Sequence, residues 1–138
     1  MKKKASLISA AILLICCLFL AGCSSDTYTS SYKAVGLTQT YDDDSAEMTF
    51  SEFQGTKVYK LKFSGKNDKT LKYNLKLEVG SATIYYDTEG KKKELVSLKS
   101  GDRVEDKFKD ITYDSIYIII ETNEKCLNGA FSFETKSY

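Results

Sequence analysis

Apolar and polar residues alternate with a period of two through most of the chain after Val35. The clearest runs are Tyr59, Leu61, Phe63 and then Leu71 to Val79, with lysine, asparagine or glutamate at the positions between. Residues with this period point to opposite faces of a β-strand in turn, so each run predicts a strand with one buried and one solvated face. Turn-forming residues from Ser64 to Lys69 separate the two runs, which predicts an antiparallel hairpin.

Turn signals recur roughly every 8–12 residues downstream, which is the spacing of a sandwich or barrel. Besides the hairpin, the expected strands cover Val35–Thr40, Ala46–Phe53, Ala82–Tyr86, Glu94–Leu98, Arg103–Phe108, Ser115–Glu121 and Ala130–Thr135. We expect Gly80-Ser81 to form a primed hairpin turn and Asn128-Gly129 to separate the last two strands. The run Ser115–Ile120 is apolar on both faces, which indicates a central, doubly covered strand, although its periodicity also fits a buried helical segment. The prediction is an all-β fold, an antiparallel β-sandwich of about eight or nine strands.

The N-terminal segment has the pattern of an export signal. Lys2, Lys3 and Lys4 precede an apolar run from Leu7 to Leu20, which is too short and interrupted for a comfortable membrane span. The sequence Leu20-Ala21-Gly22-Cys23 resembles the lipobox of bacterial lipoproteins. This resemblance implies that Cys23 carries diacylglycerol and becomes the mature N-terminus, so that the protein is extracytoplasmic and anchored to the membrane. We therefore expect a signal peptide over 1–22, a lipidated flexible tether over 23–34 and one β-sandwich domain over 35–138.

Composition narrows the function classes for the processed chain. Loss of the three signal lysines reduces 20 basic residues to 17 against 19 acidic ones, a formal charge of −2, which argues against a nucleic-acid partner. Cys126 is then the one cysteine left besides Cys23, so no intramolecular disulfide is expected in the domain. A leftover cysteine in an exported protein can be a reactive thiol, but we favour a small buried hydrophobe at this position.

A second resemblance concerns the domain itself. Residues 84–91, a Gly-Asp turn and the closing segment 129–134 resemble jelly-roll β-sandwich modules of secreted bacterial proteins, including pre-peptidase C-terminal-like and carbohydrate-binding domains. The resemblance covers roughly residues 45–135 and rests on turn placement. It implies a jelly-roll-like fold and transfers no binding residue, because fold does not determine function.

Catalysis and metal binding have few candidate residues. The chain has no histidine, so the usual general base and the common nucleophile pairs are absent. Carboxylate pairs such as Asp87 with Glu89, or Glu105 with Asp106, are expected to be solvated and not catalytic. We therefore expect no enzyme and no cofactor, and a carboxylate-dependent hydrolase is the less favoured alternative. A weak calcium candidate is the acidic loop with its neighbour, Asp42, Asp43, Asp44 and Glu47. We favour a solvated loop there, because the spacing is not that of an EF-hand.

Two surface features indicate binding instead. If the predicted hairpin forms, Lys60, Lys62, Lys72 and Lys76 make one basic stripe, which suits an anionic wall polymer or lipid headgroups but also keeps an exposed strand soluble. Tyr85, Tyr113 and Tyr117 offer rings, although the lack of tryptophan weakens a sugar-stacking platform. We predict a lipid-anchored, noncatalytic binding or interaction module of the cell envelope, the alternative being an accessory subunit of an envelope protein complex.

Overall fold

The computed structural model describes residues 28–138, which contain eight strands and no helix. The predictions that fall on residues 1–27, including the signal peptide and Cys23, lie outside the described residues. The strands are β1 Ser31–Val35, β2 Thr38–Tyr41, β3 Ser45–Lys62, β4 Thr70–Val79, β5 Ala82–Asp87, β6 Lys93–Leu98, β7 Arg103–Phe108 and β8 Ser115–Lys136. All pairings between them are antiparallel, which confirms the predicted all-β, jelly-roll-like sandwich.

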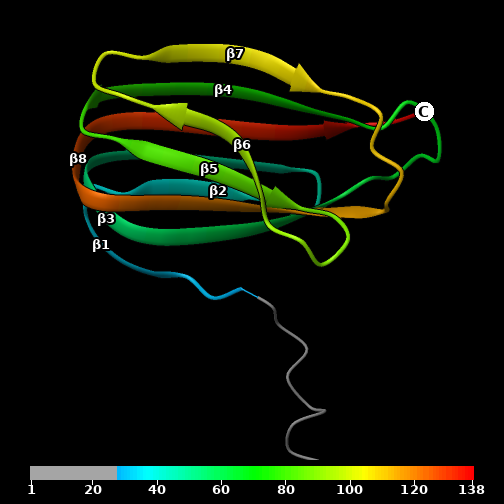
Figure 1. The fold of residues 1–138 in the computed structure, drawn as a ribbon, viewed down its shortest axis with the longest axis horizontal. Helices are drawn as coiled ribbons and strands as arrows, with labels where there is room; N and C mark the ends of the chain where they lie inside the picture. Colours follow the sequence, from blue (N-terminus) through cyan, green and yellow to red (C-terminus); the bar gives the residue numbers. More distant parts are fainter. Residues whose placement is uncertain (1–27) are drawn as a thin grey trace, which may run out of the picture.

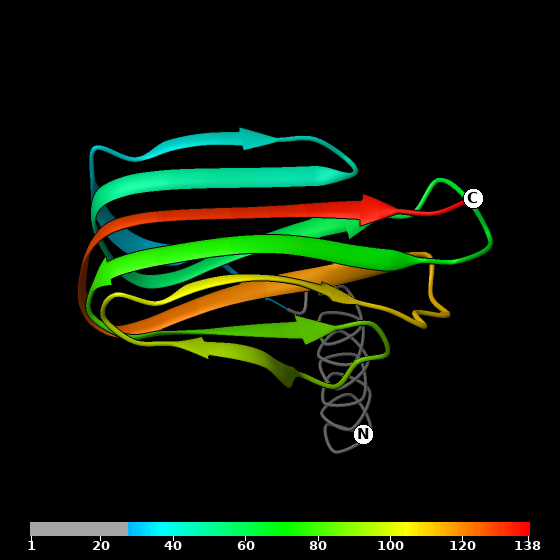
Figure 2. The same cartoon turned by 90° about the horizontal axis from the view of Figure 1, so that it is seen from above.

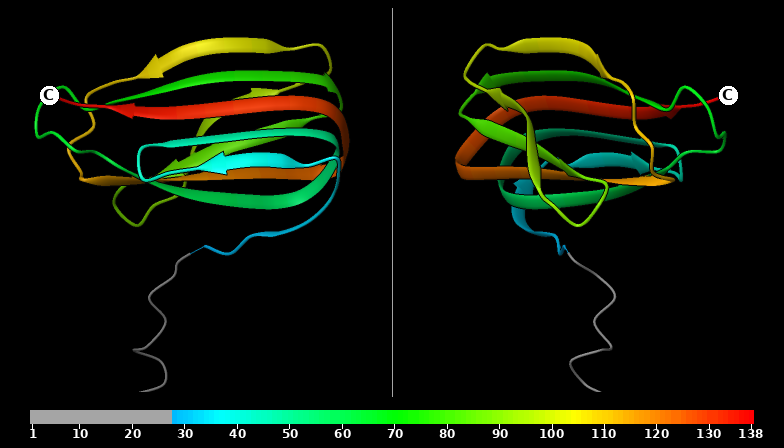
Figure 3. Two further views of the ribbon diagram at one scale, coloured as in Figure 1. Left: turned by 180° about the vertical axis from the view of Figure 1, so that it is seen from behind. Right: turned by 45° about the vertical axis from the view of Figure 1, so that its right-hand side comes forward.

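The strands form two layers joined by two long bent strands, β3 and β8. The first half of β3 and the second half of β8 lie in one layer with β2, β4 and β7, which we call sheet I. The second half of β3 and the first half of β8 lie in the other layer with β1, β5 and β6, which we call sheet II. Figures 1 and 2 show β8 curving from one layer into the other, and the C-terminus lies at the opposite end of the sandwich from these bends, as Figure 3 also shows.

The bends have identifiable local causes. The register of β3 against β8 shifts between Phe53 and Gly55, and Thr122 Oγ1 accepts the Gly55 N–H at 2.9 Å. Gly55 has a φ of +127° and lies directly against the backbone of β1, so a Cβ there would clash. A further irregularity is Asn128, which has a φ of +52° within β8. The neighbouring Gly129 lies against the Phe50 ring, so side-chain-free backbone is required there as well.

The core fills the space between the two sheets. Inward side chains of both sheets form one cluster, which includes Met48, Phe50, Tyr59, Leu61, Leu71, Leu75, Ile84, Ile116, Ile118, Ile120, Phe131 and Phe133. Fully burying an aliphatic or aromatic side chain stabilises the fold by about 1.5–3 kcal/mol relative to exposure. In sheet II the first half of β8 lies between β3 and β5, which confirms the predicted central strand over Ser115–Glu121.

The two predicted hairpins are wrong. β3 and β4 do not pair with each other, because residues 63–69 carry the chain from sheet II to sheet I. Gly80 and Ser81 likewise connect β4 in sheet I to β5 in sheet II. Turn-forming residues allow both a hairpin and an arch between layers. The arch prevails here because it lets both flanking strands bury their apolar faces while pairing with different halves of β8.

Strand boundaries were predicted well where a turn is tight and poorly where a strand bends. β7 spans the predicted Arg103–Phe108, whereas Asn128-Gly129 is a kink inside β8 and not a turn. Val35–Thr40 is interrupted at Gly36, which has a φ of +64°. Residues 31–34, predicted as tether, form most of β1, because they pair with β3 from Phe53 to Thr56.

The free thiol of Cys126 is buried, as predicted, and donates to the carbonyl oxygen of Ser81 at 3.2 Å. Burial raises the pKa of this thiol, which keeps it in the less nucleophilic protonated form. Within residues 28–138 there is no helix long and apolar enough to cross a membrane.

Candidate functional site: the outer face of sheet I

Outward side chains of sheet I form three rows that run across the strands. The strand register sets them, because residues directly opposite each other on neighbouring strands share a face. The middle row is Thr40, Glu47, Ser132, Asn74 and Glu105. The row on one side is Ser45, Glu134, Lys72 and Lys107, and the row on the other is Thr38, Thr49, Ala130, Lys76 and Arg103.

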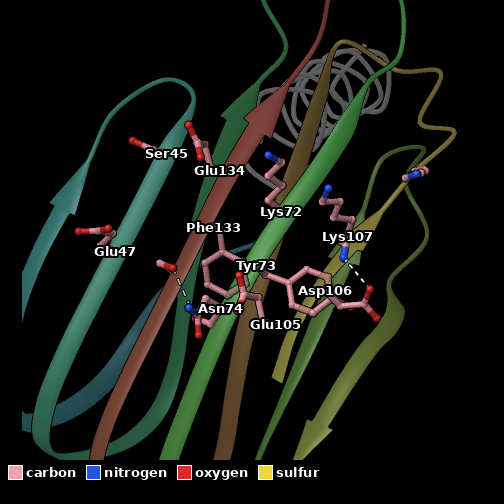
Figure 4. A pocket seen from close by; sticks show the side chains of 12 residues that line it. Ser45, Glu47, Lys72, Tyr73, Asn74, Glu105, Asp106, Lys107, Phe133 and Glu134 are labelled. Atoms are coloured by element: carbon pink, nitrogen blue, oxygen red, sulfur yellow. Dashed lines mark hydrogen bonds between the residues drawn. The ribbon is translucent and has the colours of Figure 1, made fainter. Parts of the chain in front are cut away.

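These rows line a continuous trough. Its largest part is a hollow of about 960 Å³ bordered by Glu47, Lys72, Asn74, Glu105 and Glu134 (Figure 4). Two smaller hollows continue it along the strands, since adjoining hollows share lining residues of β3, β4 and β8. From Glu134 to Asn128 on β8 the trough is roughly 20 Å long at 3.3 Å per residue.

The trough offers hydrogen-bonding and charged groups, most of them without partners among residues 28–138. Among the outward side chains of the three rows, Glu134 accepts from Lys136 at 2.8 Å, and the Ser132 hydroxyl approaches the Asn74 carbonyl oxygen at 3.5 Å. Tyr73 and Phe133 border the trough, but both side chains are buried toward the core. The face therefore provides polar contacts and no exposed ring on which a sugar could stack.

The predicted lysine stripe is divided between the two sheets. Lys72 and Lys76 lie on the outer face of sheet I, in the trough. Lys60 and Lys62 lie on sheet II, where the Lys60 ammonium is 5.3 Å from the Tyr117 ring centroid and Lys62 is 3.8 Å from Asp43. The prediction of one four-lysine surface is wrong, because the hairpin on which it rested does not form.

The cations next to Lys72 and Lys76 are Lys107 and Arg103 of β7, and not Lys60 and Lys62 as predicted. Lys107 lies directly opposite Lys72, and Arg103 lies directly opposite Lys76. Sequence reasoning missed both residues although it predicted their strand correctly. The alternation of Arg103, Glu105 and Lys107 indicates an outward polar face, but nothing local indicates that β7 pairs with β4.

The acidic candidates do not converge on one point. Asp42, Asp43 and Asp44 connect β2 to β3 and border a separate hollow, whereas Glu47 lies in the trough. The Asp43 carbonyl oxygen accepts the Lys62 N–H at 2.6 Å, and that of Asp44 accepts the Thr135 N–H at 2.9 Å, so both are occupied by the fold. Across residues 28–138, no group of three histidine, cysteine or acidic residues is placed to hold a metal ion.

The tyrosine candidates belong to sheet II and its loops. Tyr85 has the Lys92 ammonium 4.2 Å from its ring centroid, and Tyr113 donates to Glu89 at 2.9 Å. Tyr117 packs edge-to-face against Tyr28, with ring centroids 5.4 Å apart. The rings of Tyr85 and Tyr117 are therefore in contact with neighbours within the chain, whereas Tyr113 is exposed and bonded only through its hydroxyl.

Asp87 has a structural role that sequence reasoning missed, since we expected a solvated carboxylate. The residue is 2% exposed, and its Oδ1 accepts the backbone N–H groups of Glu89, Gly90 and Lys91 at 2.7–3.0 Å. Its Oδ2 accepts the Tyr28 hydroxyl at 2.5 Å. Burial raises the pKa of Asp87, but the bonds from Tyr28 and the three N–H groups outweigh it and hold the pKa below its ordinary value.

Tyr28 and Ser30 fasten the chain before β1 to sheet II. The Ser30 hydroxyl oxygen accepts the Val58 N–H at 2.9 Å, in addition to the contacts of Tyr28 with Asp87 and Tyr117. Burial, reinforced by the bond to Asp87, raises the pKa of Tyr28 to about 12. We call residues 28–30 the strap. It fixes the chain just before β1 against sheet II.

No protein-family model matches this chain, and no curated protein sequence matches it. Among solved structures, a family 29 carbohydrate-binding module mutant complexed with mannohexaose is 13% identical, with a TM-score of 0.43 over 80% of this chain and 94% of that one. A family 61 module in complex with β-1,4-galactotriose is 11% identical, with a TM-score of 0.43 over 82% and 85%. The Drosophila melanogaster CENP-C cupin domain is 16% identical, with a TM-score of 0.32 over 78% and 70%. Similarity at this level transfers no ligand and no site residue to this chain.

Proposed function

We propose that this protein is a noncatalytic binding module of the bacterial cell envelope that holds an extended ligand in the trough of sheet I. The observation that carries the proposal is the trough itself, about 20 Å long by strand geometry and lined by registered rows of polar side chains with few partners in the protein. Exposed carboxylates, amides, hydroxyls and ammonium groups on a rigid sheet suit a polar polymer better than an apolar small molecule.

The carboxylates of the trough do not favour hydrolysis. Glu47 and Glu105 lie in the same row with two strands between them, which separates their Cα atoms by about 14 Å at 4.8 Å per strand. Glycosidase carboxyl pairs are roughly 5–9.5 Å apart. Glu134 is closer to Glu47, but both side chains are exposed, whereas the general acid of a glycosidase such as lysozyme lies in a hydrophobic pocket.

Lipid attachment at Cys23 and the strap together would orient this module. Four residues separate Cys23 from Tyr28, so the strap can lie at most about 18 Å from the lipidated residue. Because the strap lies on sheet II, we infer that sheet II faces the bilayer and that the trough on sheet I faces away from it. This orientation would present the trough to polymers outside the membrane.

A protein partner is the second candidate, supported by a small apolar row at the bends. This row crosses four neighbouring strands in the order Val35 of β1, Glu52 of β3, Leu127 of β8 and Val79 of β4. Both valines are exposed. If this row docks an envelope protein, Val35→Lys with Val79→Lys should abolish the association and leave polymer binding intact. Pull-down from envelope extracts with and without the two substitutions measures this.

The trough is tested by substitution of its central polar pair. Asn74→Ala with Ser132→Ala removes an amide from an exposed position and a hydroxyl from a half-buried one, so it should weaken co-sedimentation with isolated envelope polymers with little change in Tm. A matched control is Thr83→Ala with Ser97→Ala, which removes two hydroxyls that face each other on sheet II. Equal binding by the trough variant and the wild type would refute the proposed site.

A further inference from the structure

The geometry points to an anionic linear polymer as the ligand of the trough, held by two cross-strand pairs of cations on β4 and β7. The pairs are Lys72 with Lys107 and Lys76 with Arg103. This inference rests on the proposed function and adds the chemical class of the ligand.

Like charges directly opposite each other destabilise an antiparallel pair of strands. Here two such pairs stand on one exposed face of the same two strands. Six other lysines of the domain have a carboxylate within 4.0 Å, namely Lys62, Lys69, Lys92, Lys93, Lys125 and Lys136, whereas lysines such as Lys60 and Lys99 have none among residues 28–138 but do not stand directly opposite another cation. None of the four paired cations has such a contact in the described part of the chain.

The neighbouring strand does not supply the missing negative charge. Lys76 has Ala130 opposite it on β8, and Lys72 has Glu134, whose carboxylate accepts from Lys136 at 2.8 Å. At the outward positions 72, 74, 76, 103, 105 and 107, four cations stand against the single carboxylate of Glu105. Asp102 and Asp106 also border this side, but their carboxylates accept the backbone N–H groups of Lys99 and Lys107. The outward positions of β4 and β7 therefore carry a net positive charge that is complementary to an anion.

The spacing of the pairs favours a polymer over a small anion. The pairs are four residues apart along β4, which separates them by about 13 Å, and Asn74 with Glu105 lies between them. One phosphate or carboxylate can contact one pair, but only a chain of anionic groups reaches both. Arg103 can bind such a group through two parallel N–H donors, whereas the lysines act as point charges.

The opposite side of the trough has a different chemistry. β3 and the second half of β8 provide hydroxyl groups at Ser45, Thr49 and Ser132 together with the carboxylate of Glu47. These groups suit the hydroxyls of a polyol or sugar backbone, while the anionic groups of the polymer lie over β4 and β7. Figure 4 shows this division, with Lys72 and Lys107 on neighbouring strands and Glu47 across the trough.

Binding of two anionic polymers by the full chain, purified from membranes in nonionic detergent, tests the inference. The probes are long-chain inorganic polyphosphate and polygalacturonate, with dextran as a neutral polymer and orthophosphate as a monomeric anion. We expect binding of at least one polyanion that weakens steeply from low to physiological salt, because exposed charges are screened over roughly 8–10 Å. Dextran and orthophosphate should bind at least tenfold more weakly, and the preferred polyanion distinguishes phosphate from carboxylate chemistry.

Substitutions in the two cation pairs test whether these residues hold the polyanion. Lys72→Gln with Lys107→Gln, and Lys76→Gln with Arg103→Gln, should each weaken polyanion binding at least tenfold. Lys60→Gln with Lys62→Gln removes the same charge from sheet II and should leave binding unchanged. Both pair variants should keep a Tm at or above that of the wild type, because each relieves a like-charge contact.

Three results would overturn the inference. Equal losses in the pair variants and the sheet II control would show unspecific charge attraction, and a Tm several degrees lower in the pair variants would show a structural role. Dextran binding as tight as polyanion binding, lost with Asn74→Ala and Ser132→Ala, would reject the anionic ligand while the proposed function stands. If envelope polymers bind and no trough substitution weakens that binding, the proposed function fails as well.

Discussion

Tyr28→Phe is the sharpest perturbation of the strap. The substitution keeps the ring that packs edge-to-face on Tyr117, and it removes the hydroxyl that donates to Asp87 Oδ2 at 2.5 Å. Asp87 keeps its three backbone N–H bonds on Oδ1, so the turn at residues 88–91 should persist. The change therefore isolates one hydrogen bond to a buried carboxylate.

The expected loss follows from the charge and burial of Asp87. Hydrogen bonds to charged groups contribute about 1.5–3 kcal/mol, and we take the lower end because Tyr28 is only partly buried. For a domain of this size, about 1.5 kcal/mol lowers Tm by roughly 6 °C. The strap should also detach more often, which exposes the peptide bonds before β1 to proteases.

Thermal unfolding and limited proteolysis measure both effects. Tyr113→Phe is the matched control, because it removes a tyrosine hydroxyl bound to a carboxylate, that of Glu89, at an exposed site. Exposed pairs of this kind contribute little, so this variant should unfold and be cleaved as the wild type does. Equal Tm and equal cleavage for Tyr28→Phe and Tyr113→Phe would refute the strap as a stabilising element.

Four further predictions concern the anchor, the core, the strap and the acidic loop. If Cys23 carries the proposed diacylglycerol, Cys23→Ala should move the protein from the membrane to the soluble fraction, because two acyl chains suffice for stable attachment, and an unchanged membrane fraction would refute lipidation. Ile118→Asp places an unpaired charge in the core and should cost more than about 3 kcal/mol in chemical denaturation, whereas an unchanged midpoint would refute the central strand. The bond between Tyr28 and Asp87 needs a neutral phenol with a raised pKa of about 12 and a carboxylate with a lowered pKa. Its stabilisation should therefore be complete between about pH 4 and 10, be lost above pH 10 as the phenol ionises and below pH 4 as the carboxyl is protonated, and be absent at every pH in Tyr28→Phe melting curves. Calcium should not raise Tm, and a chelator-reversible rise that disappears in Asp42→Asn with Asp44→Asn would establish a calcium site.

Local patterns were sufficient to predict the strands but not their partners. The alternation from Leu71 to Val79 and the tight turns around Arg103–Phe108 predicted β4 and β7 closely, because side-chain period and turn chemistry are local properties. β4 and β7 pair with each other although β5 and β6 lie between them in the sequence, and no local pattern indicates this pairing. The cation pairs of the trough could not be predicted for the same reason.

Bent strands explain the remaining differences. Asn128-Gly129 is a strong turn signal, but here the pair lets β8 kink beside Phe50 and continue along β4. A sequence cannot distinguish a turn that reverses a strand from a kink that moves it into a second sheet, since both need a left-handed or glycine position. Asp87 was misjudged because one of its hydrogen-bond partners, Tyr28, lies 59 residues away in the sequence.

A residue-resolved map of ligand contacts tests most directly whether the trough is the ligand-binding face. Backbone amide chemical shifts of the isotopically labelled protein would be followed by nuclear magnetic resonance during titration with the envelope polymer that it binds. If the ligand binds in the trough, the perturbed amides should cluster at residues 72–76, 103–107 and 130–134 on sheet I. Perturbations confined to sheet II, around Lys60, Thr83 and Tyr117, would contradict it.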